Sequence, residues 1–260
     1  MIMNERPAIV ELSHVHKQFH KKTVIKDVSF QISYGQIYGL LGPNGAGKTT
    51  TIQMLTGLMK PDRGAIYVNG SDVIHHSLRI RSHMGIVPDA DELLDDLTCL
   101  EFLQFIGSIR NIPKNTLNDR IKEWLTIFHL WEHRKFLLGS YSHGMRKKVQ
   151  FIASVLHQPK LLIIDEPTNG LDPDMMILLR DLLLHLKAKG VSVLVSTHHL
   201  SFAENVCDQV CLIKDGTVCK DGFISDILRD THTSSLESAY ANLSNSSSEG
   251  DKINDLLTNW

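Results

Sequence analysis

A glycine-rich octapeptide between an apolar run and a helical stretch constrains the fold of this chain more than any other feature. The apolar run 36–41 has the character of a short buried strand, and residues 49–58 have the character of a helix. In this context glycines let successive backbone N–H groups converge on an anion, and the helix N-terminus adds positive potential. The pattern GxxxxGK[ST] is satisfied by Gly42, Pro43, Asn44, Gly45, Ala46, Gly47, Lys48 and Thr49.

The end of this loop supplies a charge and a metal ligand. Lys48 is expected to reach the β and γ phosphates of a nucleoside triphosphate, and the Thr49 hydroxyl is expected to bind Mg²⁺. Thr50, the next residue of the expected helix, is grouped with the nucleotide-binding residues. The sequence therefore predicts an α/β fold with a phosphate-binding loop at residues 42–49.

A second apolar strand, Leu161–Ile164, ends in the two acids Asp165 and Glu166. Adjacent residues of a strand point to opposite sides, so the two carboxylates need not have the same task. Asp165 is placed to hold the Mg²⁺ shell, usually through water, and Glu166 can polarise the attacking water in line with the γ phosphate. Pro167, which has no N–H to donate, then ends the strand.

A second helix start, at Tyr141 to Met145, offers another place where an anion could be held. A serine and a glycine at a helix N-terminus can bind a phosphate, although an ordinary serine N-cap has the same appearance. The residues leave open whether both helix ends serve one nucleotide or whether the second serves the nucleotide of a partner. The residues concerned are Ser142, His143, Gly144 and Met145.

The remaining patterns divide the chain into one large domain, residues 1–230, and a C-terminal extension, residues 231–260. Residues 8–34 and 64–69 alternate like antiparallel strands, and residues 89–150 read as a helical insert with a capping box at Thr98 and Glu101. Strands at 161–164 and 191–196 alternate with helices at 145–156 and 174–188, which predicts a parallel sheet with crossovers. The Ser- and Asn-rich stretch after about residue 243 is expected to be mobile.

Charge and hydropathy limit the partners. With 27 Lys and Arg against 29 Asp and Glu, the net charge of −2 gives no reason to expect nucleic acid. The most apolar stretch of the second half is interrupted by Arg180 and Asp181, so no membrane-spanning segment is expected. The four cysteines lack CxxC spacing and are expected to be core residues in a reducing cytosol.

Together these motifs resemble the nucleotide-binding subunits of ABC transporters from about residue 7 to residue 228. The resemblance implies ATP and Mg²⁺ as ligands, ATPase activity with Glu166 as general base, and a P-loop NTPase (RecA-like) core. It makes residues 141–145 the signature motif, residues 169–172 the D-loop and His198 the switch histidine touching the γ phosphate. Phe19 stands where an aromatic ring stacks on adenine in that family.

The same resemblance implies partners. Two subunits, identical or related, would pair head to tail, with each ATP between one phosphate loop and the signature motif of the other subunit. A separate transmembrane permease would hold the pair at the cytoplasmic face of the membrane. The segment Leu236–Leu243 is similar to the closing segment of exporter-type subunits, so export is favoured over import. The alternative is a non-transport ABC ATPase acting as a soluble regulatory or interaction protein.

Three positions depart from the family pattern. His143 replaces a glycine and Met145 a glutamine of the signature motif, and Asp89 stands where a glutamine is expected. Exporter-type relatives tolerate a carboxylate near Asp89, so the resemblance does not imply an inactive site. Because an Asp can approach the metal as a hard oxygen ligand, we count Asp89 among the metal-binding residues with Thr49 and Asp165. The alternative is an exposed loop acid with no role. The related DNA-repair ATPases carry a long coiled coil between the two motif halves, and residues 49–142 show no sustained heptads.

Overall fold

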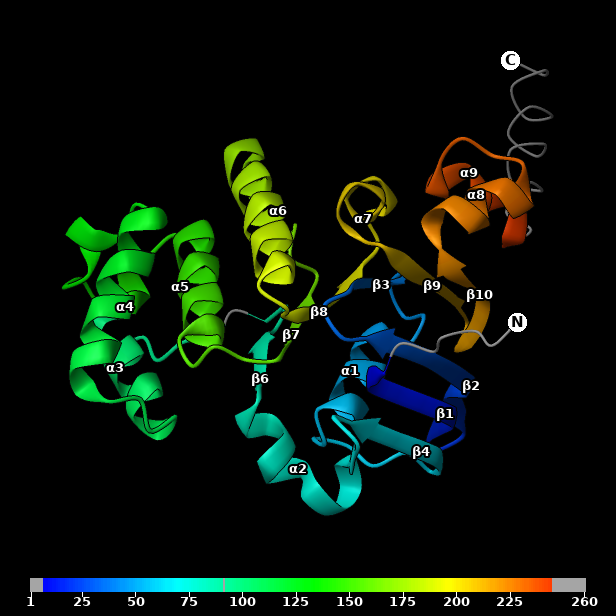
Figure 1. The fold of residues 1–260 in the computed structure, drawn as a ribbon, viewed down its shortest axis with the longest axis horizontal. Coiled ribbons are helices and arrows are strands. Elements are labelled where there is room, and N and C mark those ends of the chain that lie inside the picture. Colours follow the sequence, from blue (N-terminus) through cyan, green and yellow to red (C-terminus); the bar gives the residue numbers. More distant parts are fainter. Residues whose placement is uncertain (1–6, 91, 245–260) are drawn as a thin grey trace.

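The computed structural model describes residues 7–90 and 92–244 of the 260. Within that part of the chain ten strands form one continuous sheet, in the order β5-β4-β1-β2-β10-β9-β3-β8-β7-β6 (Figure 1). One half of the sheet is antiparallel and the other half is mainly parallel, as the sequence predicts. None of the described helices is both long enough and apolar enough to cross a membrane.

The antiparallel half is built from the N-terminal strands. The long β1–β2 hairpin turns between Phe19 and Lys22, and β1 also pairs with β4. Apolar side chains along these strands face inward, where they pack in a core shared with strands of the parallel half. The strands are β1 (Ala8–Phe19), β2 (Lys22–Ser33), β4 (Arg63–Val68) and β5 (Ser71–Asp72).

In the parallel half, every residue of β3, β7 and β8 is buried, as expected for strands covered on both faces. The strand predicted at 191–196 begins one residue later, at Ser192. The strands β6, β9 and β10 were not predicted from the sequence. The strands are β3 (Ile37–Leu41), β6 (Met84–Val87), β7 (Leu161–Asp165), β8 (Ser192–Thr197), β9 (Gln209–Lys214) and β10 (Thr217–Phe223), of which β10 runs antiparallel to β9.

Helices follow several of these strands. The helix after the phosphate loop is shorter than the predicted 49–58, because Gly57 adopts a positive φ of 68° that ends it. Asp172 caps α6 by accepting from the backbone N–H of Met175, and Pro173 stands at its first turn. The helices are α1 (Lys48–Leu55), α2 (Val73–Ser82), α6 (Pro173–Ala188), α7 (Leu200–Val206) and α8 (Ile224–Thr231).

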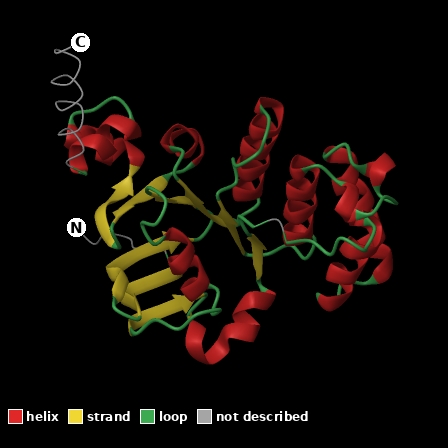
Figure 2. Cartoon of the chain, turned by 180° about the vertical axis from the view of Figure 1, so that it is seen from behind, coloured by secondary structure: helices red, strands yellow, loops and turns green. Residues whose placement is uncertain are grey.

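The predicted helical insert is present as α3 (Cys99–Ile109), α4 (Lys114–Ile127) and α5 (His143–Val155). The capping box of Thr98 and Glu101 begins α3, as predicted. The predicted helix at 145–156 begins two residues earlier, because Ser142 caps it. Figure 2 shows these helices at one end of the molecule and the antiparallel strands at the other.

The first part of the predicted C-terminal extension packs on the body of the protein. Helix α9 (Leu236–Leu243) contacts α7 and α8, and Leu236 and Ala239 are fully buried there. The carbonyl of Ser244 accepts a hydrogen bond from Lys214 Nζ at 2.6 Å. The extension is therefore ordered to Ser244, and the rest of the expected mobile tail lies outside the described residues.

Candidate nucleotide-binding site

The loop 42–49 links β3 to α1 and requires glycine at two positions. A Cβ atom on Gly42 would lie 2.1 Å from the carbonyl oxygen of Ile213. Gly47 has φ +107°, and a Cβ atom there would lie 2.4 Å from Ile25 Cδ1. Pro43, Asn44 and Gly45 form the exposed tip, while Ala46 is buried and Thr50 is half-buried on α1.

Lys48 is held inside this loop and is almost completely buried. Its ammonium donates to the carbonyl oxygens of Gly42 at 2.8 Å and Pro43 at 3.3 Å. The same ammonium forms an ion pair with Glu166 Oε1 at 3.1 Å. The cation is thus fixed at the mouth of the loop, where the sequence analysis expects phosphate oxygens.

Asp165 lies at the carboxyl end of β7, opposite Ser196 of β8. Its carboxylate accepts from Thr49 Oγ1 at 3.0 Å and from the Ser196 hydroxyl. Burial raises the pKa of Asp165 above the ordinary aspartate value, and the negative charges of Glu166 and Asp89 add to that effect. The sequence analysis pairs Thr49 with Asp165, and the two side chains are in contact. Ser196 was not predicted as a site residue.

Glu166 follows with a positive φ of 47°, which is uncommon for a residue with a side chain. Its backbone N–H donates to the Ser196 carbonyl at 2.8 Å, and its Oε2 lies 2.9 Å from Nδ1 of His198. Burial acts to raise the pKa of Glu166, but the hydrogen bond and charge of Lys48, together with His198, bring it below the ordinary glutamate value. The carboxylate therefore stays ionised between two basic groups.

Asp89 follows β6 and approaches the same region. Its Oδ1 accepts from Asn169 Nδ2 at 3.1 Å, and its backbone carbonyl accepts from Lys147 Nζ at 2.6 Å. Its charge contributes to the raised pKa of Asp165. Mg²⁺ prefers oxygen ligands and usually takes one or two carboxylates with phosphate and water. The hydroxyl of Thr49 and the carboxylates of Asp165 and Asp89 are ligands of this kind, so the residues fit the ion.

The signature segment caps α5 and lies away from the phosphate loop of its own chain. Ser142 Oγ accepts from the Met145 N–H at 3.3 Å. Helix α5 packs against β6, and β6 is three strands from β3, or about 14 Å at the usual strand spacing. A Cβ atom on Gly170 would lie 2.3 Å from His143 Cδ2, so the unusual histidine packs on the loop that follows Glu166.

Phe19 stands at the end of the β1–β2 hairpin and is 39% exposed. Lys17 Nζ lies 5.6 Å from the centre of its ring. Ile25 of the same hairpin contacts the phosphate loop at Gly47, so the hairpin and the loop share a packed boundary. Phe19 is therefore available to an incoming ring on the hairpin that borders the loop.

Leu200 and Tyr240 lie beside the phosphate loop, although neither was predicted as a site residue. A cavity of about 300 Å³ is lined by Gly42, Pro43, Asn44, His198, Leu200 and Tyr240. Burial, followed by the nearby Cys219 and Asp215, raises the pKa of Tyr240 above its ordinary value. The sequence analysis identified the segment Leu236–Leu243, but only tertiary packing brings Tyr240 of α9 to the phosphate loop.

Comparisons with known proteins agree with this geometry. The model of the family described as ABC transporter matches residues 25–169. The Nod factor export ATP-binding protein I of Ralstonia nicotianae is 36% identical over 214 residues, which cover 82% of this chain and 67% of that protein. The linearmycin resistance ATP-binding protein of Bacillus subtilis is 33% identical over 219 residues, or 84% and 70% of the two chains.

Solved structures give the same result. An ATP-binding subunit of an ABC transporter superposes with a TM-score of 0.86 at 33% identity, covering 91% of this chain and 99% of that one. A nucleotide-free ATP-binding cassette superposes with a TM-score of 0.74 at 26% identity, covering 87% and 97%. The chain therefore belongs to the ABC transporter family, as an ATP-binding subunit with ATPase activity.

Proposed function

We propose that this ATPase powers export through a separate membrane permease. The observation that carries the proposal is the similarity of this chain to two proteins named for Nod factor export and linearmycin resistance, each matched over more than four fifths of this chain. The helix α9, which resembles the closing segment of exporter-type subunits, supports the same reading because it packs on the body of the protein beside the phosphate loop.

In the proposed reaction the loop 42–49 binds the phosphates of ATP, with Lys48 neutralising charge on the β and γ groups. Thr49, Asp165 and Asp89 would hold Mg²⁺, which supplies further positive charge at these phosphates. Glu166 accepts a proton from water as the water oxygen attacks the γ phosphorus and the bond to the bridging oxygen breaks, giving ADP and phosphate. His198, 2.9 Å from Glu166, orients that carboxylate and contacts the γ phosphate.

Two subunits would act together. Ser142 and Gly144 begin α5, which packs on β6, and β6 is three strands away from β3, the strand that precedes the phosphate loop. This separation favours contact of the two residues with the nucleotide of a partner subunit. In a head-to-tail pair the Ser142 hydroxyl and the first N–H groups of α5 would meet the γ phosphate held by the other subunit. ATP then acts as the bridge between the subunits, and its hydrolysis releases them.

We propose that the permease docks where α2 and α3 approach each other, which would hold this subunit at the cytoplasmic face of the membrane. Arg110 at the end of α3 donates to the carbonyl of Arg81 in α2 at 2.7 Å. Leu78 of α2 is 79% exposed and Ile109 of α3 is 59% exposed, so each helix presents an apolar side chain to a partner. Asp89 follows β6, the strand after α2, which would link this surface to the nucleotide.

The test is co-purification of tagged chain from membranes in mild detergent, with mass spectrometry of the proteins retained. We expect a multi-span protein that Ile109→Glu loses and Ile177→Glu keeps, because Ile177 is equally apolar and 52% exposed but lies on α6. Retention of no membrane protein by the wild-type chain, with ATPase activity intact, would instead support the soluble regulatory protein. ATP-driven efflux by the reconstituted pair would separate export from import.

A further inference from the structure

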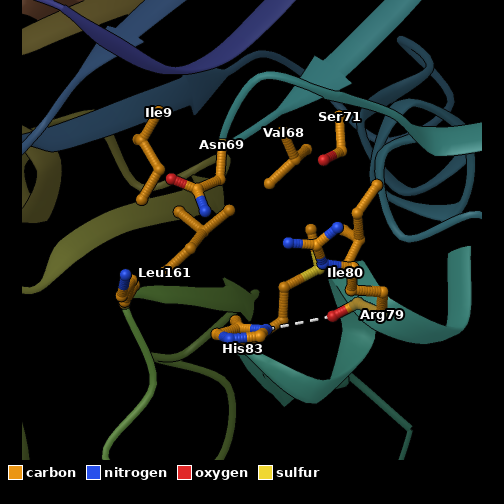
Figure 3. A pocket seen from close by; sticks show the side chains of 10 residues that line it. Ile9, Val68, Asn69, Ser71, Arg79, Ile80, His83 and Leu161 are labelled. Carbon is orange, nitrogen blue, oxygen red and sulfur yellow. Dashed lines mark hydrogen bonds between the residues drawn. The ribbon is translucent and has the colours of Figure 1, made fainter. Parts of the chain in front are cut away.

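A second polar cavity lies at the amino ends of the parallel strands. It has a volume of about 180 Å³ and sits between the β4–β5 turn, the last turns of α2 and the start of β7. Figure 3 shows Asn69 and Ser71 on one side of it and Arg79 and His83 on the other. Buried apolar residues of β1, β4, α2, β6 and β7 form its floor.

This cavity is separate from the nucleotide site. The phosphate loop follows the carboxyl end of β3, whereas Lys160 and His83 precede the amino ends of β7 and β6. Because these strands run parallel, the two sites lie at opposite edges of the sheet. A ligand here would not compete with ATP for the same groups.

The lining is basic. The ten residues that line the cavity include Arg79 and Lys160 and no carboxylate. Among the described residues, neither of these two cations has an ion-pair or hydrogen-bonding partner for its side chain. Two positive charges around one small cavity repel each other, and an anion between them relieves that repulsion.

Neutral donors complete the lining. The Tyr34 hydroxyl donates to Asn69 Oδ1, which leaves the amide nitrogen of Asn69 to donate elsewhere. Nδ1 of His83 lies 3.0 Å from the Arg79 carbonyl, the contact drawn in Figure 3, so Nε2 is the ring nitrogen that remains. The Lys160 N–H donates to the His83 carbonyl at 3.0 Å, which fixes the two backbones beside each other.

We propose that this cavity binds a phosphate group, held by Arg79 and Lys160 with donors from Asn69 and Ser71. A tetrahedral oxyanion suits this set, because it offers acceptors in several directions to two cations and neutral donors. The group could arrive as a free phosphate, on a small phosphate ester or on a lipid headgroup. Bound there, it would join the antiparallel half of the sheet to α2 and β7.

The test is an NMR titration of the full chain with inorganic phosphate at constant ionic strength, in the Lys48→Ala background to weaken binding at the phosphate loop. We expect saturable amide shifts at residues 69–71, 79–83 and 160. The variant Arg79→Gln with Lys160→Gln should raise the dissociation constant by about tenfold or more. The control, Lys21→Gln with Lys114→Gln, removes the same net charge from exposed sites and should leave the constant unchanged.

Melting curves give a second readout that does not depend on the assignment of NMR resonances. In the Lys48→Ala background, phosphate should raise the melting temperature of the control pair more than that of the cavity pair, each relative to equal chloride. If Arg79 serves only the C-terminal end of α2, both pairs will respond equally to phosphate, and that result overturns the proposal. Shifts confined to residues 42–49 overturn it as well.

The source of the phosphate is a separate arm of the same experiment. Glycerol 3-phosphate is compared with vesicles that contain phosphatidylglycerol, each with the cavity pair and the control pair. Saturable shifts with the soluble ester support a small metabolite, and vesicle binding lost only in the cavity pair supports a lipid headgroup. If no phosphate compound binds more tightly to the control pair than to the cavity pair, the proposed phosphate site is wrong, whether or not the protein powers export.

Discussion

The ammonium of Lys48 lies 3.1 Å from Oε1 of Glu166, so the cation expected to bind phosphate is paired with the carboxylate expected to activate water. Phosphates that enter the loop would compete with Glu166 for that ammonium. If Lys48 turned to phosphate, Glu166 would lose the partner that lowers its pKa and would become a stronger proton acceptor. We therefore propose that nucleotide binding and activation of the base are coupled through this ion pair.

Replacing Lys48 with alanine should weaken Mg·ATP binding by about a hundredfold or more, because the remaining donors of the loop are mainly neutral amides. Titration calorimetry measures the dissociation constant for Mg·ATP directly. Lys22→Ala, an exposed cation on the neighbouring hairpin, serves as the control and should bind normally. An unchanged affinity of Lys48→Ala for Mg·ATP would show that residues 42–49 do not bind the phosphates.

Glu166→Gln should bind Mg·ATP at least as tightly as the wild type, since a neutral amide holds Lys48 less firmly than a carboxylate. Turnover should fall by about a hundredfold or more, the usual effect of losing a general base. With ATP, the variant should accumulate a dimer on a sizing column, and with ADP it should not. Full hydrolysis by this variant would move the base elsewhere, with His198 the first alternative.

Asp89→Asn should raise the Mg²⁺ concentration needed for half-maximal ATPase activity, because it removes a charged oxygen ligand near Asp165. The amide can still accept from Asn169, so the loop itself is kept. Asp96→Asn, an exposed acid of the same segment, is the matched control. An equal Mg²⁺ requirement in both variants would mean that Asp89 does not contact the metal.

Stability should decline below neutral pH in part through His157. Burial, with the charge of Arg110, lowers the pKa of His157 from 6.5 to about 4, and its Nε2 lies 2.9 Å from the Met84 carbonyl. The folded state therefore favours the neutral ring, so this contribution is complete above pH 6.5 and is lost as the pH falls toward 4.

Urea unfolding of wild type and His157→Asn between pH 7.5 and 4.5 measures that contribution. Over this pH range the free energy of unfolding of the wild type should fall by about 1 to 2 kcal/mol more than that of the variant. Water reaches part of the ring, and the figure is reduced for that reason. Parallel curves would show that His157 titrates alike in the folded and unfolded chain.

Leu236→Ala should destabilise the protein by about 2 to 4 kcal/mol, since the side chain is completely buried where α9 packs on α7. Thermal or urea unfolding reports the loss. Leu78→Ala, at a leucine that is 79% exposed, should change stability by less than about 0.5 kcal/mol. Equal effects would indicate that α9 does not stay docked in solution.

The phosphate loop and the acidic strand end could be predicted because each depends on short-range sequence. A buried strand, a glycine-rich turn and a helix start occupy consecutive residues, and Asp165 and Glu166 directly follow an apolar run. The contact of Thr49 with Asp165 also follows. Asp165 ends β7, and Thr49 lies in the first turn of α1, which the loop connects to the carboxyl end of the parallel strand β3.

Other features depend on contacts between distant segments. Helix α2 has weak apolar periodicity, with two histidines near its start, and is fixed by the Asp72 cap and by packing on β4 and β6. The packing of His143 on Gly170 and the approach of Tyr240 to the phosphate loop join segments far apart in sequence. No local pattern carries information about such pairs.

The two halves of the sheet meet at a joint with very few backbone bonds. In the part of the chain that the structure describes, strands β10 and β2 pair only at Thr217 and Asp27, with a further bond from the Lys26 N–H to the Gly216 carbonyl at 2.8 Å. Apolar side chains hold the rest of the joint, and their attraction has no preferred direction. A small rotation of the antiparallel half about this joint would break few backbone hydrogen bonds, and it would change the position of Phe19 relative to the phosphate loop.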